Sequence, residues 1–169
     1  MKKITLLLML LFSYNSNSSD LKDNEGYLLV RIIINDPFII TNTNAGIRKL
    51  LLNGEDRHTF EDLKIGVNSY LIKTDVGSYY WDTLKIGAYS YYPLKKMAFN
   101  FQVKEKKINY PGDLIITNKG SGTASFDFVN RSTLALLDLK ENHSNIYTKN
   151  NVIYSGRGRD IFIQENSEE

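Results

Sequence analysis

The sequence predicts a mainly β protein that folds as an antiparallel β-sandwich, with one short helix near the C-terminus. Three observations predict this fold class. Short runs rich in β-branched and aromatic residues recur along the chain, turn-forming residues separate them at regular spacing, and several runs alternate apolar with polar side chains. Many short strands joined by turns are typical of a sandwich, and no internal repeat or heptad pattern favours another fold.

The first predicted strand belongs to the centre of a sheet. Tyr27–Ile34 is dense in leucine, valine and isoleucine, which favour a strand buried within a sheet. Asn35-Asp36-Pro37 ends this strand, because proline lacks the amide donor that a sheet ladder requires. We expect a short strand at Phe38–Ile40 and then a polar loop over Thr41–Gly46.

Two hairpins are predicted next. Ile47–Leu52 is a strand, and the Asn53-Gly54 pair that follows favours a two-residue type I′ turn, because both central residues of that turn need positive φ. The turn predicts that Glu55–Phe60 folds back on the strand. Ser69–Lys73 is a further strand, and Thr74-Asp75-Val76-Gly77 is the turn after it.

Aromatic residues distinguish the middle of the chain. Ser78–Leu84 is predicted to be a strand whose alternation places Tyr79 and Trp81 on one face and Tyr80 on the other. The segment Lys96–Val103 is predicted to alternate throughout, so that one of its faces is buried and the other is wet. The buried face consists of Met97, Phe99, Phe101 and Val103.

A proline interrupts the strand that follows. Lys104–Lys107 is a solvated turn, and Ile108–Thr117 returns as a strand with Pro111-Gly112 at its centre. Two interpretations of this dipeptide stay open. The proline lies at a sheet edge or in a bulge, or Tyr110–Asp113 forms a type II turn with Pro and Gly at its central positions.

The C-terminal part contains the one predicted helix. After the glycine-rich loop Asn118–Gly122, the strand Thr123–Val129 alternates, with its apolar face made by Ala124, Phe126 and Phe128. Ser132 is predicted to cap a helix that ends near Lys140. The helix is expected to bury leucines: Leu134, Leu137 and Leu136. Two short strands end the domain, Val152–Tyr154 and Ile161–Ile163.

The first residues have the layout of a secretory signal peptide. Lys2 and Lys3 precede the apolar run Ile4–Phe12, and the chain turns polar over Ser13–Asp20. The run is too short to cross a bilayer, which takes about 20 apolar residues. We expect cleavage near Ser18, which divides the chain into a signal peptide (1–18), a disordered leader (19–25), a single β-sandwich domain (26–163) and a frayed acidic tail (164–169).

The composition restricts the compartment and the partners. The chain holds no cysteine, which excludes a cysteine-linked lipid, thiolate metal sites and a cysteine nucleophile. Removing Lys2 and Lys3 takes two charges from the formal +2 and leaves a neutral domain, which lacks the basic surface that nucleic acid requires. We expect a bacterial protein that is periplasmic or secreted and that does not span the membrane after cleavage.

Aromatic residues supply the candidate binding site. Tyr89, Tyr91 and Tyr92 lie in a predicted loop, and Tyr80 and Trp81 come from the strand before it. An exposed aromatic row stacks on sugar rings or forms an apolar patch for a protein partner. The alternative is that these side chains belong to the core and to an ordinary sheet surface.

Patterns for catalysis or metal binding are weak. His58 and His143 lie far apart, and neither has a partner at the spacing of a metal site. A hydrolase needs two carboxylates held about 5 to 10 Å apart, and the acidic residues in predicted turns or at strand ends are Glu55, Asp56, Glu61, Asp62, Asp75, Asp82 and Asp113. We expect solvated loop charges here, with no metal and no cofactor.

Three segments carry a resemblance to a known group. Gly77–Trp81, Phe99–Val103 and Ile108–Leu114 resemble, in their order, small exported Gram-negative proteins with a prealbumin-like or carboxypeptidase-regulatory-like sandwich, which is similar to the immunoglobulin-like sandwich. The resemblance covers residues 27–163 and departs from the group at Lys104–Lys107, where a Pro-Gly turn is usual. It implies the same fold, the same compartment and a non-enzymatic role.

These observations together predict a non-enzymatic, exported binding protein of the bacterial envelope. Its expected partner is another envelope or surface protein, reached through a sheet edge or through the tyrosine-rich loop. A module for cell-wall glycan that uses exposed tyrosines and Trp81 is the alternative. A hydrolase whose carboxylates come from distant parts of the chain is the third hypothesis.

Overall fold

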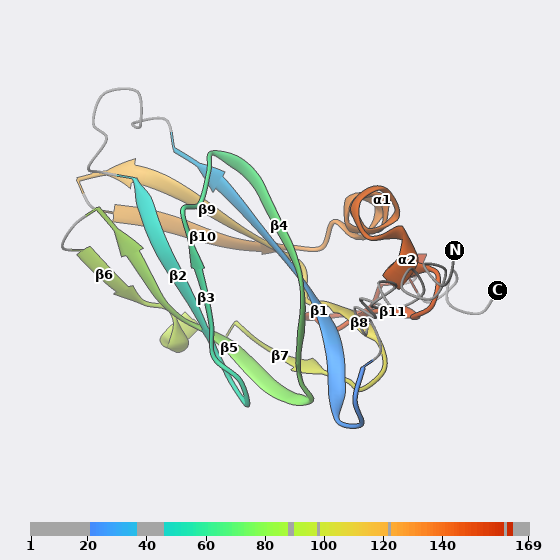
Figure 1. The fold of residues 1–169 in the computed structure, drawn as a ribbon. Helices are drawn as coiled ribbons and strands as arrows, with labels where there is room; N and C mark the ends of the chain where they lie inside the picture. Colours follow the sequence, from blue (N-terminus) through green and yellow to red (C-terminus); the bar gives the residue numbers. More distant parts are fainter. Residues whose placement is uncertain are drawn as a thin grey trace, which may run out of the picture.

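The computed structural model describes residues 21–36, 46–87, 90–97, 99–121, 123–160 and 162–163. Within these residues the chain forms two β-sheets packed face to face, with two short helices against the outer face of one sheet (Figure 1). The predicted fold class, a mainly β sandwich with a short helix near the C-terminus, is confirmed. The predicted signal peptide, the strand at Phe38–Ile40 and the acidic tail lie outside the described residues.

Sheet A, the larger sheet, is built around one long strand. Its strands are β1 (Glu25–Asn35), β4 (Gly66–Asp75), β8 (Ile108–Tyr110), β9 (Asp113–Gly120), β10 (Thr123–Val129) and β11 (Val152–Tyr154). β4 pairs antiparallel with β1, while β8 and β9 follow one another along the opposite edge of β1 and run parallel to it. Gly26 to Ile34 are all buried, which explains the dense apolar run of the predicted central strand.

Sheet B is smaller and antiparallel throughout its described strands. They are β2 (Ile47–Asn53), β3 (His58–Glu61), β5 (Gly77–Ile86), β6 (Ser90–Pro93) and β7 (Asn100–Val103). β5 lies at the centre, with β2 and then β3 on one side and with β7 and β6 end to end on the other. The predicted aromatic strand is therefore the middle of this sheet.

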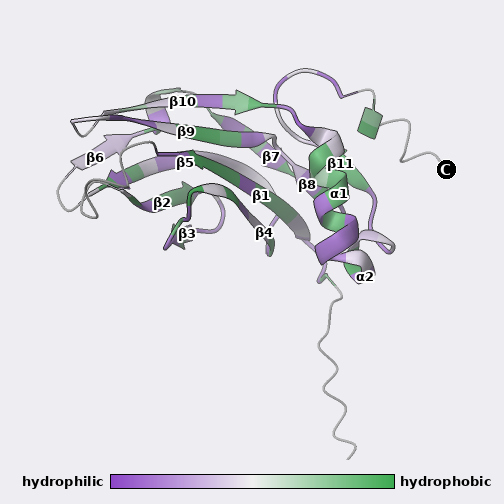
Figure 2. Cartoon of the chain, turned by 90° about the horizontal axis from the view of Figure 1, so that it is seen from above, coloured by the Kyte–Doolittle hydropathy of each residue, from purple (hydrophilic) through white to green (hydrophobic). Residues whose placement is uncertain are grey.

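Two apolar cores result from this arrangement. The main core fills the space between the sheets, and its largest side chains are Trp81 and Tyr79. The second core lies between the outer face of sheet A and two helices, α1 (Ser132–Asn142) and α2 (Ser144–Tyr147). Both helices lie over one end of sheet A in Figure 2.

The predicted hairpin is present, because β3 folds back antiparallel on β2, but the two-residue type I′ turn at Asn53-Gly54 is wrong. Leu52 pairs with His58, so the loop between the paired positions holds five residues, 53–57. Asn53 stays in β2 opposite Tyr80, and neither Asn53 nor Gly54 has a positive φ. Gly54 is needed because the backbone passes close to β5. A Cβ at Gly54 would overlap the Ser78 carbonyl of β5 and lie 2.6 Å from the Tyr79 ring.

Pro111-Gly112 lies in a bulge inside sheet A. Leu28 pairs with Asn109 and Arg31 with Asp113, so three residues between these paired positions, 110–112, oppose two residues of β1. Both strands run parallel to β1, and the dipeptide therefore does not reverse the chain. The bulge interpretation is confirmed, and the φ of +108° at Gly112 explains why a glycine follows the proline.

Helix α1 is present, and Leu136 packs partly buried against the second core as predicted, but the predicted burial of Leu134 and Leu137 is wrong. Ala135 and Leu139 face the sheet, while Leu134 and Leu137 are 47% and 49% exposed. The rotation follows from a polar contact, because the Asp138 side chain accepts a hydrogen bond from Ser69 of β4. A leucine-rich helix offers several possible apolar stripes, and this contact selects one of them.

The N-terminus of α1 also differs from the prediction. The cap residue is Arg131 rather than Ser132, and Arg131 makes no capping bond through its side chain. The backbone amide of Ser132 instead donates to the Asn130 side chain, at 3.0 Å. Asn130 therefore binds one of the backbone amides that have no partner within the helix at its start.

Two strand predictions near aromatic residues need correction. The alternation predicted over 96–103 holds at residues 99–103, because Phe99 packs against the main core and Phe101 and Val103 of β7 are buried. The residues before it form a 3₁₀ helix, η1 (Lys95–Met97), and leave Met97 43% exposed. A single turn of helix thus interrupts the alternating pattern.

The final strand predicted at Ile161–Ile163 is wrong as well. Phe162 and Ile163 are helical, while Ile161 lies outside the described residues. The backbone amide of Ile163 donates to the Asp160 carboxylate at 3.1 Å. An aspartate that binds the amide three residues later starts a helical turn and competes with strand pairing.

Candidate functional site

The predicted tyrosines divide between the two faces of sheet B. Tyr91 is 62% exposed and Tyr80 half-buried on the outer face, and Tyr92 packs against the main core. The segment that holds Tyr91 and Tyr92 is strand β6 rather than a loop, so its neighbouring side chains point to opposite faces. Tyr89 lies outside the described residues.

Trp81 is in the interior, so the expectation that it forms an exposed stacking surface is wrong. It is 2% exposed and packs on Phe60, with the ring centroids 5.9 Å apart. Tyr79 and Trp81 share the inward face of β5 and Tyr80 lies on the other face, as alternation predicted. The pairing register shifts next to Asp82, which lets Leu84 also point inward.

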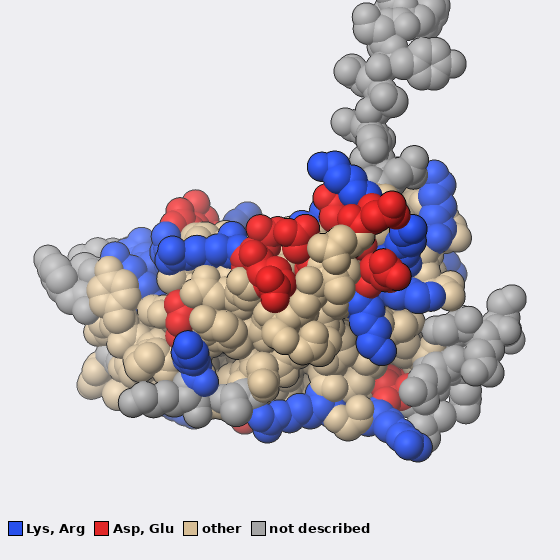
Figure 3. Space-filling view, turned by 90° about the horizontal axis from the view of Figure 1, so that it is seen from below, with Lys and Arg blue, Asp and Glu red and all other residues tan. Residues whose placement is uncertain are grey.

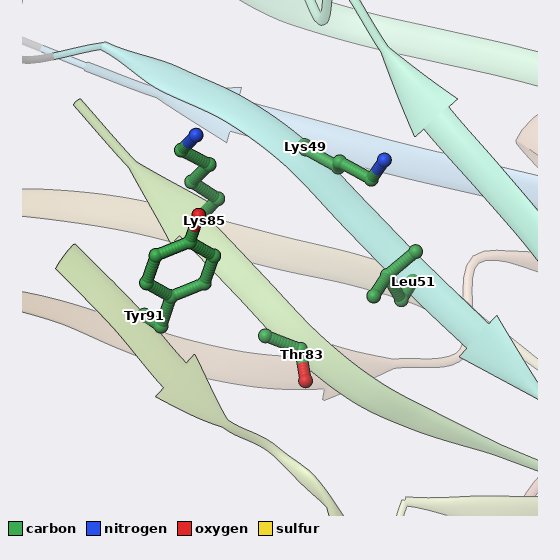
Figure 4. A pocket seen from close by; sticks show the side chains of 5 residues that line it. All are labelled: Lys49, Leu51, Thr83, Lys85 and Tyr91. Atoms are coloured by element: carbon green, nitrogen blue, oxygen red, sulfur yellow. The ribbon is translucent and has the colours of Figure 1, made fainter. Parts of the chain in front are cut away.

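The outer face of sheet B carries the candidate site, here called the tyrosine–lysine face. It comprises Lys49, Leu51, Tyr80, Thr83, Lys85, Tyr91 and Lys95. Five of these, from β2, β5 and β6, line a hollow of about 190 Å³ (Figure 4). A hollow of this size is smaller than the cavities that enclose small ligands, so it suits contact with one side chain or one ring of a larger partner.

Lysine ammonium groups lie over both tyrosine rings of this face. Lys85 Nζ is 5.3 Å from the centroid of the Tyr91 ring, and Lys95 Nζ is 5.1 Å from that of Tyr80. Lys49 forms an ion pair of 2.9 Å with Glu61 at the rim. Cation–π contacts hold the lysines beside the rings, so the face presents aromatic surface and positive charge together.

A second polar cluster is buried between sheet A and helix α1. Arg31 Nη1 is 3.6 Å from Asp113 Oδ1, and Arg31 Nε is 3.8 Å from Asp138 Oδ2. The Tyr110 hydroxyl donates to Asp113 at 2.7 Å, and Asp138 also accepts from Ser69. Strands β1, β4, β8 and β9 and helix α1 therefore each contribute one side chain to this cluster.

Burial dominates the electrostatics of this cluster. It raises the pKa of Asp113, with the Tyr110 hydrogen bond and then the Arg31 charge acting in the opposite direction. Burial, followed by the Asp113 charge, raises the pKa of Tyr110 far above its ordinary value. Asp113 is fully buried and Arg31 is 5% exposed, so a substrate does not reach these groups and the cluster serves to hold α1 on the sheet.

A third cluster lies between the β2–β3 loop and the β4–β5 hairpin. His58 Nε2 is 2.8 Å from Thr74 Oγ1, which is 2.7 Å from the Tyr79 hydroxyl. That hydroxyl accepts from the Asp56 amide at 3.2 Å and donates to the Asp75 carbonyl at 2.9 Å. Thr74 is buried, so its hydroxyl joins the two hairpins and is not available as a nucleophile.

His58 is expected to make the free energy of unfolding depend on pH. Burial lowers the pKa of His58 below its ordinary value of 6.5, against an opposing effect of Asp56. The unfolded chain then takes up the proton first as the pH falls, so stability is lost from about pH 6.5 downward. Urea titrations at pH values from about 8 to about 5 should show a larger decrease in the free energy of unfolding for the wild type than for His58→Gln. Equal losses in both proteins would contradict this prediction.

None of the seven carboxylates considered for a hydrolase lines the hollow of the tyrosine–lysine face. Five are exposed in turns or at strand ends: Glu55, Asp56, Glu61, Asp62 and Asp75. The Asp82 carboxylate accepts a hydrogen bond of 2.9 Å from the side-chain amide of Asn53, and Asp113 belongs to the buried cluster. Figure 3 shows acidic side chains close together at one end of the sandwich, with basic side chains around them. The hollow on sheet B is lined by no carboxylate.

The described residues hold neither a metal-binding cluster nor a membrane-spanning helix. No group of three or more histidine, aspartate or glutamate side chains in them could hold a metal ion. No helix among them has the length and apolar content required to cross a membrane. The described part of the chain therefore offers the tyrosine–lysine face as its candidate site.

Comparison with known proteins adds no assignment to this geometry. No protein-family model, curated protein or solved structure matches the chain. The resemblance to exported prealbumin-like or carboxypeptidase-regulatory-like proteins stays a prediction. The buried cluster was not predicted, although Arg31 gave a signal as the one charged residue within an apolar strand.

Proposed function

We propose that this chain is an exported protein of the bacterial envelope that binds another protein through the tyrosine–lysine face and performs no catalysis. Export rests on the basic, apolar and polar order of residues 1–20. A non-catalytic role is supported by the position of Tyr110 and Asp113, whose shifted pKa values arise from burial within the protein rather than in an open cleft.

The observation that carries the proposal is the environment of Tyr91. The ring is 62% exposed, lies beside Lys85, and borders a hollow that also contains Leu51. Tyrosine is enriched at the centres of protein interfaces, where a few residues carry most of the binding energy. Burial of Trp81 removes the largest ring that a glycan module would use.

The test begins with a photo-crosslinking amino acid at Thr83, in the middle of the face, in cells that export the tagged chain. The captured envelope protein is then purified, and its affinity is measured by calorimetry. We expect Tyr91→Ala to weaken binding at least about tenfold, without change in the melting temperature, because Tyr91 is a surface residue.

Leu137→Ala is the matched control, because Leu137 is also an exposed apolar residue but lies on α1, away from sheet B. It should keep the affinity within about twofold. Unchanged affinity in Tyr91→Ala would overturn the assignment of this face. Saturable binding of purified cell-wall glycan, lost in Tyr91→Ala, would replace the protein partner with the glycan alternative.

A further inference from the structure

Strand β4 forms a long free edge of sheet A. It has ten residues and pairs in regular register with β1 alone among the described strands. The edge lies at the front of sheet A in Figure 1. Edge strands leave a row of backbone groups without partners, and proteins commonly protect such rows by shortness, bulges, proline or charge.

The backbone contacts of β1 define which groups of β4 point outward. The Glu25 carbonyl accepts from the Lys106 amide, and the Tyr27 amide donates to the Lys107 carbonyl, both at 2.9 Å. The Tyr27 carbonyl also accepts from the Asn109 side chain at 3.0 Å. Odd-numbered residues of β1 thus direct their backbone groups toward β8, and even-numbered residues direct theirs toward β4.

Alternation then assigns the backbone groups of β4. Leu28, Val30 and Ile32 are opposite Ile72, Tyr70 and Asn68, which form the hydrogen-bonded pairs with β1. The residues between them are Val67, Ser69 and Leu71. Their amides and carbonyls point away from β1, and no strand among the described residues lies on that side.

The other edges of the two sheets are protected in the ways that natural proteins use. β3 and β7 have four residues each, β11 has three, β6 ends in Pro93, and β10 has a register shift at Thr123/Ala124. In contrast, the stretch Val67–Ile72 of β4 contains no charge, no proline and no bulge. Val67, the first residue of this stretch, is 55% exposed, and Ile65, which precedes β4, is 51% exposed.

We infer that β4 accepts an extended segment of a partner protein as an additional strand of sheet A. Val67, Ser69 and Leu71 supply the backbone hydrogen bonds, and exposed Val67 and Ile65 favour β-branched or aromatic residues at alternate positions of the segment. The inference is independent of the tyrosine–lysine face, which belongs to sheet B.

A partner segment is favoured over a second copy of this chain because of helix α1. Asp138 contacts Ser69, so the helix reaches β4 there, and Figure 2 shows α1 running toward this edge with α2 beyond it. Symmetric pairing of two β4 strands about Ser69 would bring two copies of these helices to the same place. A single added strand brings no second helix.

Hydrogen exchange of the full chain tests this inference. The probe is a synthetic octapeptide that alternates valine with threonine and is N-methylated along one edge, so that it cannot pair with itself. In the free protein the amides of Val67, Ser69 and Leu71 should exchange fast and those of Asn68, Tyr70 and Ile72 slowly. Saturating peptide should slow the first set at least about tenfold.

Two substitutions at one position separate the backbone from the side chain. Val67→Pro removes an outward amide without loss of a bond to β1, and we expect it to weaken peptide binding at least about tenfold. Val67→Thr keeps the amide and the branched shape at an exposed position and should stay within about threefold. Melting temperatures and exchange of the β1-facing amides report whether each variant is folded.

Several outcomes would overturn the inference. They are slow exchange of the outward amides in the free monomer, protection confined to β3 or β10, equal binding by Val67→Pro and Val67→Thr, or no binding of the alternating peptide at millimolar concentration. A concentration-dependent dimer, with protection of the same three amides, would assign the edge to a second copy instead.

Discussion

Replacing Arg31 with methionine is expected to destabilise the protein by about 3 to 5 kcal/mol, because it leaves buried carboxylates without their cation. Arg31 is 5% exposed, and the two carboxylates it serves are Asp113 and Asp138. Methionine keeps the length of the aliphatic stem, so the loss reports mainly the charge. Urea unfolding monitored by circular dichroism measures the difference.

Two further proteins distinguish this explanation from a general sensitivity to lysine or arginine replacement. Lys49→Met breaks the exposed ion pair with Glu61 and should cost less than about 1 kcal/mol. Adding Asp113→Asn and Asp138→Asn to Arg31→Met removes the orphaned charges and should recover part of the lost stability. A loss below about 1 kcal/mol in Arg31→Met would show that the cluster does not hold α1 on sheet A.

The cluster illustrates what the sequence could and could not predict. The apolar run around Arg31 predicted a central strand, and β1 is that strand, buried on both faces. The partners of Arg31 come from β9 and α1, far along the chain. Their convergence depends on two parallel pairings and on a helix that crosses the sheet, and local periodicity carries no information about either.

Alternation predicted the candidate site only in part. It separated Tyr80 from Tyr79 and Trp81 correctly, because side chains of a strand point to opposite faces. It could not decide which face is inward, and it missed β6, a four-residue strand whose last residue is a proline and which therefore resembles a loop. Partnership between lysines and tyrosines on neighbouring strands depends on register, which appears only in the structure.

Local turn chemistry was the weakest guide. The pair Asn53-Gly54 has the sequence of a type I′ turn, yet Asn53 remains paired in sheet B and its amide binds Asp82. Contacts with β5 determine the end of β2 here, and they outweigh the preference of two residues for positive φ. Tertiary packing overrode a local preference in the same way at helix α1.

Replacing Trp81 with alanine is expected to cost about 3 to 5 kcal/mol, since it removes the largest side chain of the main core and leaves a cavity between the sheets. Trp81 is 2% exposed and contacts Phe60. Its indole Nε1 has no hydrogen-bond partner, so Trp81→Phe loses volume but also removes a buried polar group. We expect Trp81→Phe to cost at least about 1 kcal/mol less than Trp81→Ala.

Urea unfolding monitored by circular dichroism compares the three proteins, and the fluorescence of Trp81, the one tryptophan of the chain, reports its environment in the wild type. An interior indole should emit at short wavelength and resist quenching by iodide, since iodide does not enter a packed core. Emission at the wavelength of solvated tryptophan, together with a loss below about 1 kcal/mol in Trp81→Ala, would place the ring outside the core. Trp81 would then be available to stack on a sugar ring, which would favour the glycan alternative.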